Sequence, residues 1–220
     1  MPLPTPCLMA VTDRALCAVP AGRQGGADGL VAAVEAAVIG GANAVQLREK
    51  DLPPAELLAL ARRLRDVTRG RALLVVNGPP EVAAAAGADG VHLPEGAPMP
   101  LKPRAGLLVG CSVHSAEAAR RAQAGGAGYV VAGPVYQTRS HPGVQPAGLT
   151  LIEEIARTVD VPVLAIGGVT PERVGEAVRA GASGVAAISA VFAAGDPRAA
   201  ALALRRALDA AWAAAGAARR

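Results

Sequence analysis

Polar side chains follow an apolar run near the start of the sequence, and their types suit the binding of an anionic substrate. The run that begins at Ala44 leads into Gln46, Arg48, Glu49 and Lys50, so that two cations and a carboxylate follow an apolar entry. Arg and Lys make strong, charge-assisted hydrogen bonds with phosphate oxygens. A surface cluster of ion pairs is the alternative, but we favour anion binding because the residues stand where a buried strand ends.

Glycines and a serine follow two later apolar runs and indicate a phosphate site. Gly167 and Gly168 follow one run, and Ile188 and Ser189 close the last one. Glycines let backbone N–H groups approach an anion closely, and a helix N-terminus supplies oriented donors and partial positive charge. A tight turn into the next helix is the alternative for the glycine pair alone. We predict phosphate binding at these four residues.

Groups able to donate or transfer protons stand in two further segments. Ser112 and His114 follow the fifth apolar run, where Ser112 could donate to a ligand and His114 could transfer a proton or hold the turn. Residues 133–143 are bounded by Gly and Pro and predict a mobile lid over the substrate. The hydrogen-bonding residues of this lid include Thr138, Ser140 and His141.

Short Val-, Leu- and Ile-rich runs alternate with helical patterns along the chain, which is typical of parallel strands buried on both faces. The predicted strands are residues 7–11, 44–48, 73–77, 90–93, 107–112, 129–132, 162–166 and 184–188. The predicted helices are residues 29–39, 53–67, 80–86, 115–124, 150–158, 171–180 and 197–213. This order predicts a (β/α)8 TIM barrel, in which the carboxyl ends of the strands carry the active site.

A repeat supports closure of the barrel, because the pattern Gly-Ala-x-x-Val precedes every second strand, at residues 41, 87, 126 and 181. Each of these glycines can end a helix in the left-handed conformation. Four prolines between residues 94 and 103 predict that the fourth helix is short or absent. We expect a single domain over residues 1–220, with a core of about 7–213 and a frayed tail at 214–220.

The composition argues against several partners. The net charge is only +4, and the arginines of residues 62–71 lie on the polar face of a predicted helix. Aromatic residues make up 2% of the chain, which removes the stacking surface that single-strand nucleic-acid binders need. No apolar run approaches the roughly 20 residues that span a bilayer. Cys7, Cys17 and Cys111 lack metal-binding spacing. We expect a cytoplasmic protein with no nucleic-acid or membrane partner.

Seven motifs in barrel order resemble the thiamine phosphate synthase and thiazole tautomerase superfamily over residues 11–197. The motifs are QLREK, VVN, DGVHL, GCSVHS, GPVYQT, PVLAIGG and GVAAISAVF. The resemblance implies an enzyme of thiamine biosynthesis that acts on a phosphorylated thiazole, and it implies a homodimer. It places the thiazole phosphate at Gly167, Gly168, Ile188 and Ser189, and it adds Gln46, Arg48, Lys50, Asn77, Ser112 and Thr138 to the substrate pocket.

The two branches of this superfamily differ at the metal site. Synthases join the thiazole phosphate to hydroxymethylpyrimidine diphosphate through Mg²⁺ held by two aspartates, where this chain has Gly78 and Ala97. Neither residue offers the side-chain oxygen that Mg²⁺ prefers. Asn77-Gly78 and the Leu-Pro-x-Gly turn at residues 93–96 resemble the tautomerase branch instead. That branch moves a proton and needs no metal.

We therefore expect a thiazole tautomerase with no cofactor and no metal. The proton-transfer His of that branch is replaced by Pro134, so His141, or otherwise His114, is predicted to transfer the proton. A thiamine phosphate synthase is the alternative and would require Mg²⁺, with Glu95 as a shifted ligand and Arg139 in place of a lid Lys. A non-catalytic sensor of a phosphate ligand is the second alternative.

Overall fold

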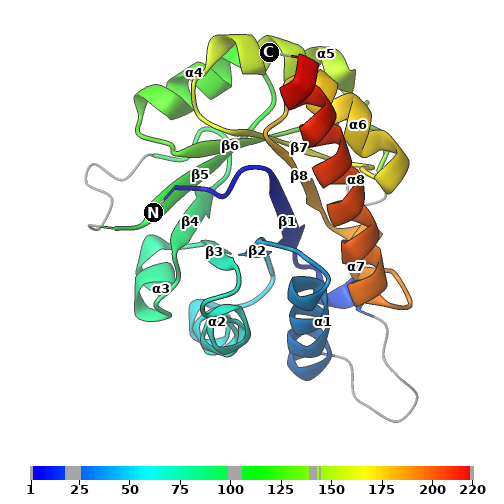
Figure 1. Cartoon of the computed structure of the whole chain (residues 1–220). Helices are drawn as coiled ribbons and strands as arrows, with labels where there is room; N and C mark the ends of the chain where they lie inside the picture. The colour runs from blue at the N-terminus through cyan, green and yellow to red at the C-terminus, as the bar shows by residue number, and fades with distance from the viewer. Residues whose placement is uncertain (1, 18–25, 99–105, 139–142, 144, 219–220) are drawn as a thin grey trace.

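The computed structural model describes residues 2–17, 26–98, 106–138, 143 and 145–218, and eight parallel strands close into a barrel in chain order (Figure 1). The strands are β1 (Cys7–Val11), β2 (Ala44–Leu47), β3 (Leu73–Asn77), β4 (Gly90–Leu93), β5 (Leu108–Val113), β6 (Tyr129–Ala132), β7 (Val163–Ile166) and β8 (Gly184–Ala187). The predicted TIM-barrel fold is confirmed, and each strand boundary lies within one residue of its prediction.

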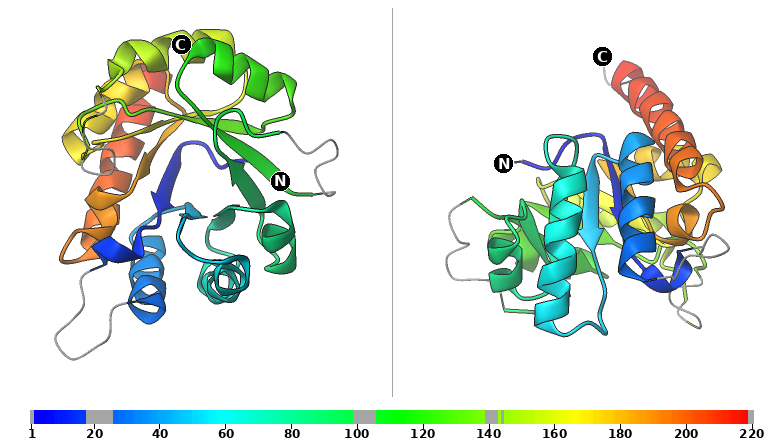
Figure 2. Two further views of the ribbon diagram at one scale, coloured as in Figure 1. Left: turned by 180° about the vertical axis from the view of Figure 1, so that it is seen from behind. Right: turned by 90° about the horizontal axis from the view of Figure 1, so that it is seen from below.

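Helices surround the barrel, as the end-on and side views show (Figures 1 and 2). They are α1 (Ala27–Ile39), α2 (Pro54–Thr68), α3 (Pro80–Ala85), α4 (Ala116–Ala124), α5 (Gly148–Thr158), α6 (Pro171–Arg179), α7 (Ser189–Phe192) and α8 (Pro197–Ala218), with a 3-10 turn η1 (Arg14–Leu16). The short helix α7 and η1 were not predicted. In its described residues the connection from β4 to β5 contains no helix, as its prolines predicted.

Helix α8 is longer than expected, because it continues to Ala218 rather than ending at Ala213. Its Ala-rich sequence favours the helix over a frayed tail. The helix packs against α1 and α6, and its C-terminal end projects beyond the rest of the molecule, on the face opposite the carboxyl ends of the strands (Figure 2, right). Among the described residues, no helix is long and apolar enough to cross a membrane.

Side chains of alternating strand residues form two separate apolar cores. Val45 and Leu47 belong to the large core between the strands and the helices. Ala44, Tyr129 and Leu164 belong to a smaller core inside the barrel, which Leu3 of the N-terminal segment also joins. Because strand side chains alternate between faces, the residues that share the face of Ala44 point into the barrel. This alternation decides which polar residues reach the substrate side.

The turns that enter the strands have the predicted geometry. The four glycines of the Gly-Ala-x-x-Val repeat all have positive φ, between 65° and 106°.

Strand β1 pairs with both β2 and β8, and Cys7 stands beside Gly184 at the seam that closes the barrel. A Cβ atom on Gly184 would lie 2.1 Å from the carbonyl oxygen of Cys7. Only glycine therefore fits at this seam.

Candidate active site

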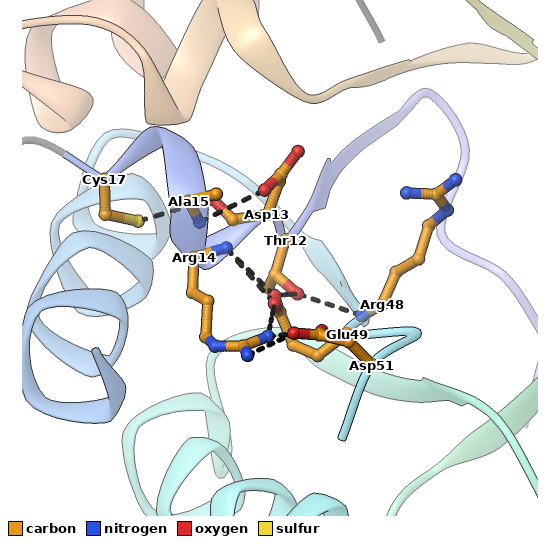
Figure 3. Close-up of polar contacts among 8 residues, drawn as sticks. All are labelled: Thr12, Asp13, Arg14, Ala15, Cys17, Arg48, Glu49 and Asp51. Carbon is orange, nitrogen blue, oxygen red and sulfur yellow. Dashed lines mark hydrogen bonds and ion pairs between the residues drawn. The ribbon is translucent and has the colours of Figure 1, made fainter. Parts of the chain in front are cut away.

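An ion-pair network joins the carboxyl ends of β1 and β2 (Figure 3). We call Thr12, Arg14, Glu49 and Asp51 the rim network. Glu49 is buried, and its carboxylate accepts hydrogen bonds from the Thr12 hydroxyl at 2.7 Å and from the Arg14 guanidinium at 3.0 Å. Arg14 also donates to Asp51 at 2.6 Å. Glu49 and Asp51, which flank Lys50, therefore both hold the loop after β2 in place.

The rim network orients Arg48. The Thr12 hydroxyl donates to Glu49 and accepts the backbone N–H of Arg48 at 2.9 Å. Figure 3 shows the Arg48 guanidinium extending away from the network, to the side opposite Arg14. This follows from strand alternation, because Arg48 shares the inward face of Ala44 and Gln46 while Glu49 faces outward. Arg48 and Lys50 line a cavity of about 580 Å³ together with Arg14, Glu49 and Asp51 of the rim network.

The rim network also sets its own protonation states. The hydrogen bonds from Arg14 lower the pKa of Asp51 below its ordinary value. The hydrogen bonds to Asp51 and Glu49 raise the pKa of the Arg14 guanidinium. Both shifts favour the charged forms. Arg14 and Asp51 are therefore ionised at neutral pH, and their opposing charges largely cancel.

Below the rim, Gln46 and Asn77 meet inside the barrel. The Asn77 amide donates to Gln46 Oε1 at 3.4 Å, and Gln46 Nε2 approaches Met9 Sδ at 3.6 Å. Gln46 is buried at the end of β2 and Asn77 is partly exposed at the end of β3. These two predicted substrate residues therefore lie together, with polar atoms available toward the mouth of the barrel.

His92 links two further strands through buried hydrogen bonds. Its Nδ1 lies 3.1 Å from the Tyr129 hydroxyl, and its Nε2 lies 2.9 Å from Ser112 Oγ. His92 and Tyr129 are buried, whereas Ser112 is partly exposed. Burial, with the nearby positive charge of Arg48, lowers the pKa of His92 to about 3. His92 is therefore neutral at physiological pH. Of these three hydrogen-bonded residues, Ser112 is the one that reaches the substrate side.

The glycine pair after β7 packs against the loop after β6. A Cβ atom on Gly167 would lie 2.7 Å from Pro134 Cα, and one on Gly168 would lie 2.5 Å from the Gln137 carbonyl oxygen. The Tyr136 N–H donates to the Gly167 carbonyl at 3.0 Å. Both glycines have positive φ. Close packing of the two loops therefore requires glycine here, whether or not a phosphate binds.

Ile188 and Ser189 lie where β8 leads into α7. Ser189 is the first residue of α7 and Ile188 caps it. The first N–H groups of a helix have no acceptor within the helix. Because β7 pairs with β8 in register, with Ile166 beside Ala186, the ends of both strands meet at one edge of the barrel. The four predicted phosphate residues are therefore on neighbouring loops.

His114, one of the two predicted proton-transfer residues, is hydrogen-bonded to Glu95. His114 Nδ1 lies 2.5 Å from Glu95 Oε2, and the same carboxylate oxygen accepts the His114 backbone N–H at 2.8 Å. His114 is exposed and holds the loops after β4 and β5 together. His141 and Ser140 lie outside the described residues. Thr138 is the last described residue before residues 139–142 and is partly exposed.

Sequence reasoning missed two features of the site. Thr12 and Arg14 were not selected, although Thr-Asp directly after β1 is a polar signal at a strand end. Tyr129 and His92 were not selected either, because both stand within apolar runs. The alternation of side chains along a strand was the available signal. Residues two apart share a face, so His92 lies on the same face of β4 as Gly90.

Comparison with known proteins identifies the family. A family model described as thiamine monophosphate synthase matches residues 8–191. This chain belongs to that thiamine monophosphate synthase family. Among its relatives, a thiamine-phosphate synthase of Roseiflexus castenholzii is 43% identical over 92% of this chain and 90% of that protein. A putative thiamine-phosphate synthase of Geobacter sulfurreducens is 43% identical over 86% of this chain and 92% of its own length.

A solved structure agrees with this assignment. The thiamine phosphate pyrophosphorylase from Pyrococcus furiosus superposes with a TM-score of 0.80 at 35% identity, covering 93% of this chain and 96% of that one. The resemblance stated from the motifs is therefore confirmed. The expected place in thiamine biosynthesis and the transferase option among the two predicted enzymes are confirmed as well.

The prediction of a thiazole tautomerase is wrong. Relatives that match most of this chain are named thiamine-phosphate synthase, in one case putative, at 40–46% identity. The structure supplies a physical reason within the described residues. His92 is buried with a pKa of about 3, His114 is paired with Glu95, and Pro134 stands where a proton-transfer His was needed.

The two-aspartate Mg²⁺ site that the resemblance attributes to synthases does not fit the residues of this chain. Gly78 offers no side-chain oxygen, and a Cβ atom there would lie 2.9 Å from Leu57 Cδ2, so that the leucine side chain would have to shift to admit a carboxylate. Ala97 packs against the outer core, and Glu95 is engaged by His114. The described residues contain no group of three or more His, Cys, Asp or Glu side chains placed to hold a metal.

Proposed function

We propose that this chain is a thiamine-phosphate synthase, which joins hydroxymethylpyrimidine diphosphate to thiazole phosphate and releases pyrophosphate. The observation that carries the proposal is the likeness of nearly the whole chain to proteins named thiamine-phosphate synthase, at 43% identity over 92% of its length in one case. In this reaction a C–N bond forms between the pyrimidine methylene carbon and the thiazole nitrogen. The C–O bond to the diphosphate breaks, and the electron pair leaves with pyrophosphate.

Arg48 and Lys50 bind the diphosphate in this proposal. Both line the cavity to which Arg14, Glu49 and Asp51 of the rim network also contribute, and the Arg48 guanidinium points away from the carboxylates of that network. Negative charge on the leaving pyrophosphate increases as the C–O bond breaks, so fixed cations stabilise the transition state more than the ground state. Gln46, Asn77 and Ser112 offer uncharged hydrogen-bonding groups deeper in the barrel, where they orient the substrates.

The thiazole phosphate binds at the glycine pair and at the start of α7. The supporting observation is the adjacency of these loops at the ends of β7 and β8, which is the usual phosphate position in such barrels. Close packing of Gly167 and Gly168 against the loop after β6 links this phosphate site to Thr138.

The test measures thiamine phosphate by mass spectrometry and pyrophosphate by a coupled assay, with both substrates present and with each omitted. We expect both products in equal amounts and only when both substrates are supplied. Tight binding of thiazole phosphate without turnover would overturn the proposal and favour a sensor. The cytoplasmic location and the homodimer remain proposals, which fractionation and light scattering would test.

A further inference from the structure

Three residues on neighbouring strands form a continuous hydrogen-bonded chain inside the barrel, which we call the lumen relay: Tyr129, His92 and Ser112. The two contacts are 3.1 Å from the Tyr129 hydroxyl to His92 Nδ1 and 2.9 Å from His92 Nε2 to Ser112 Oγ. Tyr129 is 0% exposed and His92 is 1% exposed. Only Ser112, at the end of β5, is partly open to the mouth of the barrel. The lumen relay therefore runs from a sealed interior to the substrate side.

The direction of the hydrogen bonds follows from the number of donors. A neutral imidazole has one N–H donor and one acceptor nitrogen. Among the described residues, His92 is the hydrogen-bond partner recorded for the Tyr129 hydroxyl. If Nδ1 carried the proton, the buried tyrosine hydrogen would have no acceptor, which costs about 1 to 3 kcal/mol. The Tyr129 hydroxyl must then donate to Nδ1, and the proton of His92 must lie on Nε2.

This direction fixes what Ser112 can do. Because His92 Nε2–H donates to Ser112 Oγ, the serine hydrogen cannot point back at the ring and is left to donate toward the mouth of the barrel. Asn77 lies beside His92 in the sheet register, and Gln46 contacts Asn77, so the serine joins the other uncharged groups of the site. A donor at this place suits an anionic oxygen.

We propose that Tyr129 and His92 are positioning residues that hold Ser112 as a hydrogen-bond donor to the diphosphate of the substrate. The inference rests on the proposed function, because it names the group that meets the diphosphate of that reaction. The fold makes specific room for the lumen relay, since a Cβ atom on Gly110 would lie 2.0 Å from Tyr129 Cζ. The ring of Tyr129 thus occupies space that only a glycine on β5 leaves open.

The test is a double-mutant cycle on binding of inorganic pyrophosphate, measured by titration calorimetry. In Tyr129→Phe, Nδ1 has no hydrogen-bond partner in either tautomer, so His92 loses its preference for the proton on Nε2 and the Ser112 hydrogen can turn back to Nε2. We expect the dissociation constant to rise about fivefold to tenfold, and Ser112→Ala to raise it by a similar factor. In the Ser112→Ala background, Tyr129→Phe should change binding less than twofold. A purely structural effect would instead persist in both backgrounds and overturn the proposal.

The tautomer of His92 gives a second readout that needs no variant. ¹⁵N-labelled wild-type protein should show His92 protonated at Nε2 and not at Nδ1 near pH 7, and the reverse assignment would overturn the proposal. Absence of pyrophosphate binding by the wild type would also overturn it. The turnover assay tests the synthase function separately, because a protein that binds pyrophosphate with the expected coupling but forms no thiamine phosphate keeps the lumen relay and loses the reaction. In an active enzyme, Tyr129→Phe should raise KM for the diphosphate substrate more than it lowers kcat.

Discussion

The rim network and the lumen relay orient substrate groups with opposite electrostatic means. The rim network uses full charges, and its members run from a nearly buried Glu49 side chain, 3% exposed, to an Asp51 side chain that is 68% exposed. The lumen relay is uncharged and closed to water, apart from Ser112. Isolated charges are costly to bury, whereas neutral donors and acceptors need only a partner each.

The difference teaches where each kind of group is useful. Near the mouth, solvent lowers the cost of ionisation, and the ion pairs of Arg14 leave Arg48 and Lys50 free to face a substrate. Deep in the barrel, a charged His92 would oppose Arg48, and burial keeps it neutral. The comparison leads to four tests, which begin with the largest expected change in stability.

Gly110→Ala should have the largest effect, because the new methyl group would overlap the ring of Tyr129. Overpacking of this severity lies at the upper end of the usual range, so we expect a loss of about 3 kcal/mol in the free energy of unfolding, measured in urea. Gly29→Ala in α1 is the matched control, since nothing lies within 4 Å of its Cβ position. The control should gain stability slightly. Equal effects of the two substitutions would contradict the tight fit of the lumen relay.

Glu49→Gln should lower the free energy of unfolding by about 2 to 3 kcal/mol, because it removes the buried negative charge that pairs with Arg14 and leaves one acceptor oxygen in place of two. Asp28→Asn is the control, because the Arg63–Asp28 pair is exposed and should contribute less than about 0.5 kcal/mol. The same urea titration measures both. A loss no larger than that of the control would show that the rim network does not depend on its buried carboxylate.

The pH dependence of stability should reveal the neutral His92. Its pKa is about 3 in the folded protein, below its ordinary value of 6.5, so between these pH values the unfolded chain binds a proton that the native state does not. Stability is therefore lost as pH falls below 6.5, by about 2 kcal/mol from pH 6.5 to pH 5. His92→Gln should remove this part of the slope in urea titrations at several pH values. If the pH dependence of stability in His92→Gln matched that of the wild type, another titratable group would have to cause it.

Asp51→Asn should have the smallest effect, because Asp51 is exposed and solvent screens its pairing with Arg14. We expect an unfolding midpoint close to that of the wild type, and far closer than that of Glu49→Gln. Repeating the urea titration at high salt should leave the unfolding midpoint of the variant unchanged. A midpoint as low as that of Glu49→Gln would mean that the rim network acts as one unit, without the gradient from buried to exposed members.

The sequence predicted the elements that position the site well, because a parallel barrel has a strong pattern. Apolar runs separated by helical stretches gave every strand to within one residue, and Gly41 and its three equivalents have the left-handed geometry that the repeat predicted. The C-terminal end of α8 was misjudged because the basic end at Arg219 and Arg220 suggested fraying, while the Ala-rich residues before it favour a helix.

The site was only partly predictable. Gln46, Asn77 and Ser112 were recognised because polar residues at strand ends are conspicuous. Glu49 was read as a rim carboxylate, but its partners Thr12 and Arg14 are about 35 residues away in sequence, and pairing over that distance depends on strand register. Tyr129 was hidden for a different reason, since an aromatic residue in an apolar strand gives no sign that its hydroxyl is used.

The seam between β1 and β8 has a consequence for synthesis of the chain. Cys7 is synthesised 177 residues before its partner Gly184 (184 − 7), so the edge of β1 that faces β8 stays unpaired while the strands between them are made. Joining segments so distant in sequence carries a loop-closure entropy that must be overcome before the contact gives any stability. A circular permutant that opens the chain elsewhere, and links the two present ends, would make β8 and β1 consecutive and remove that delay.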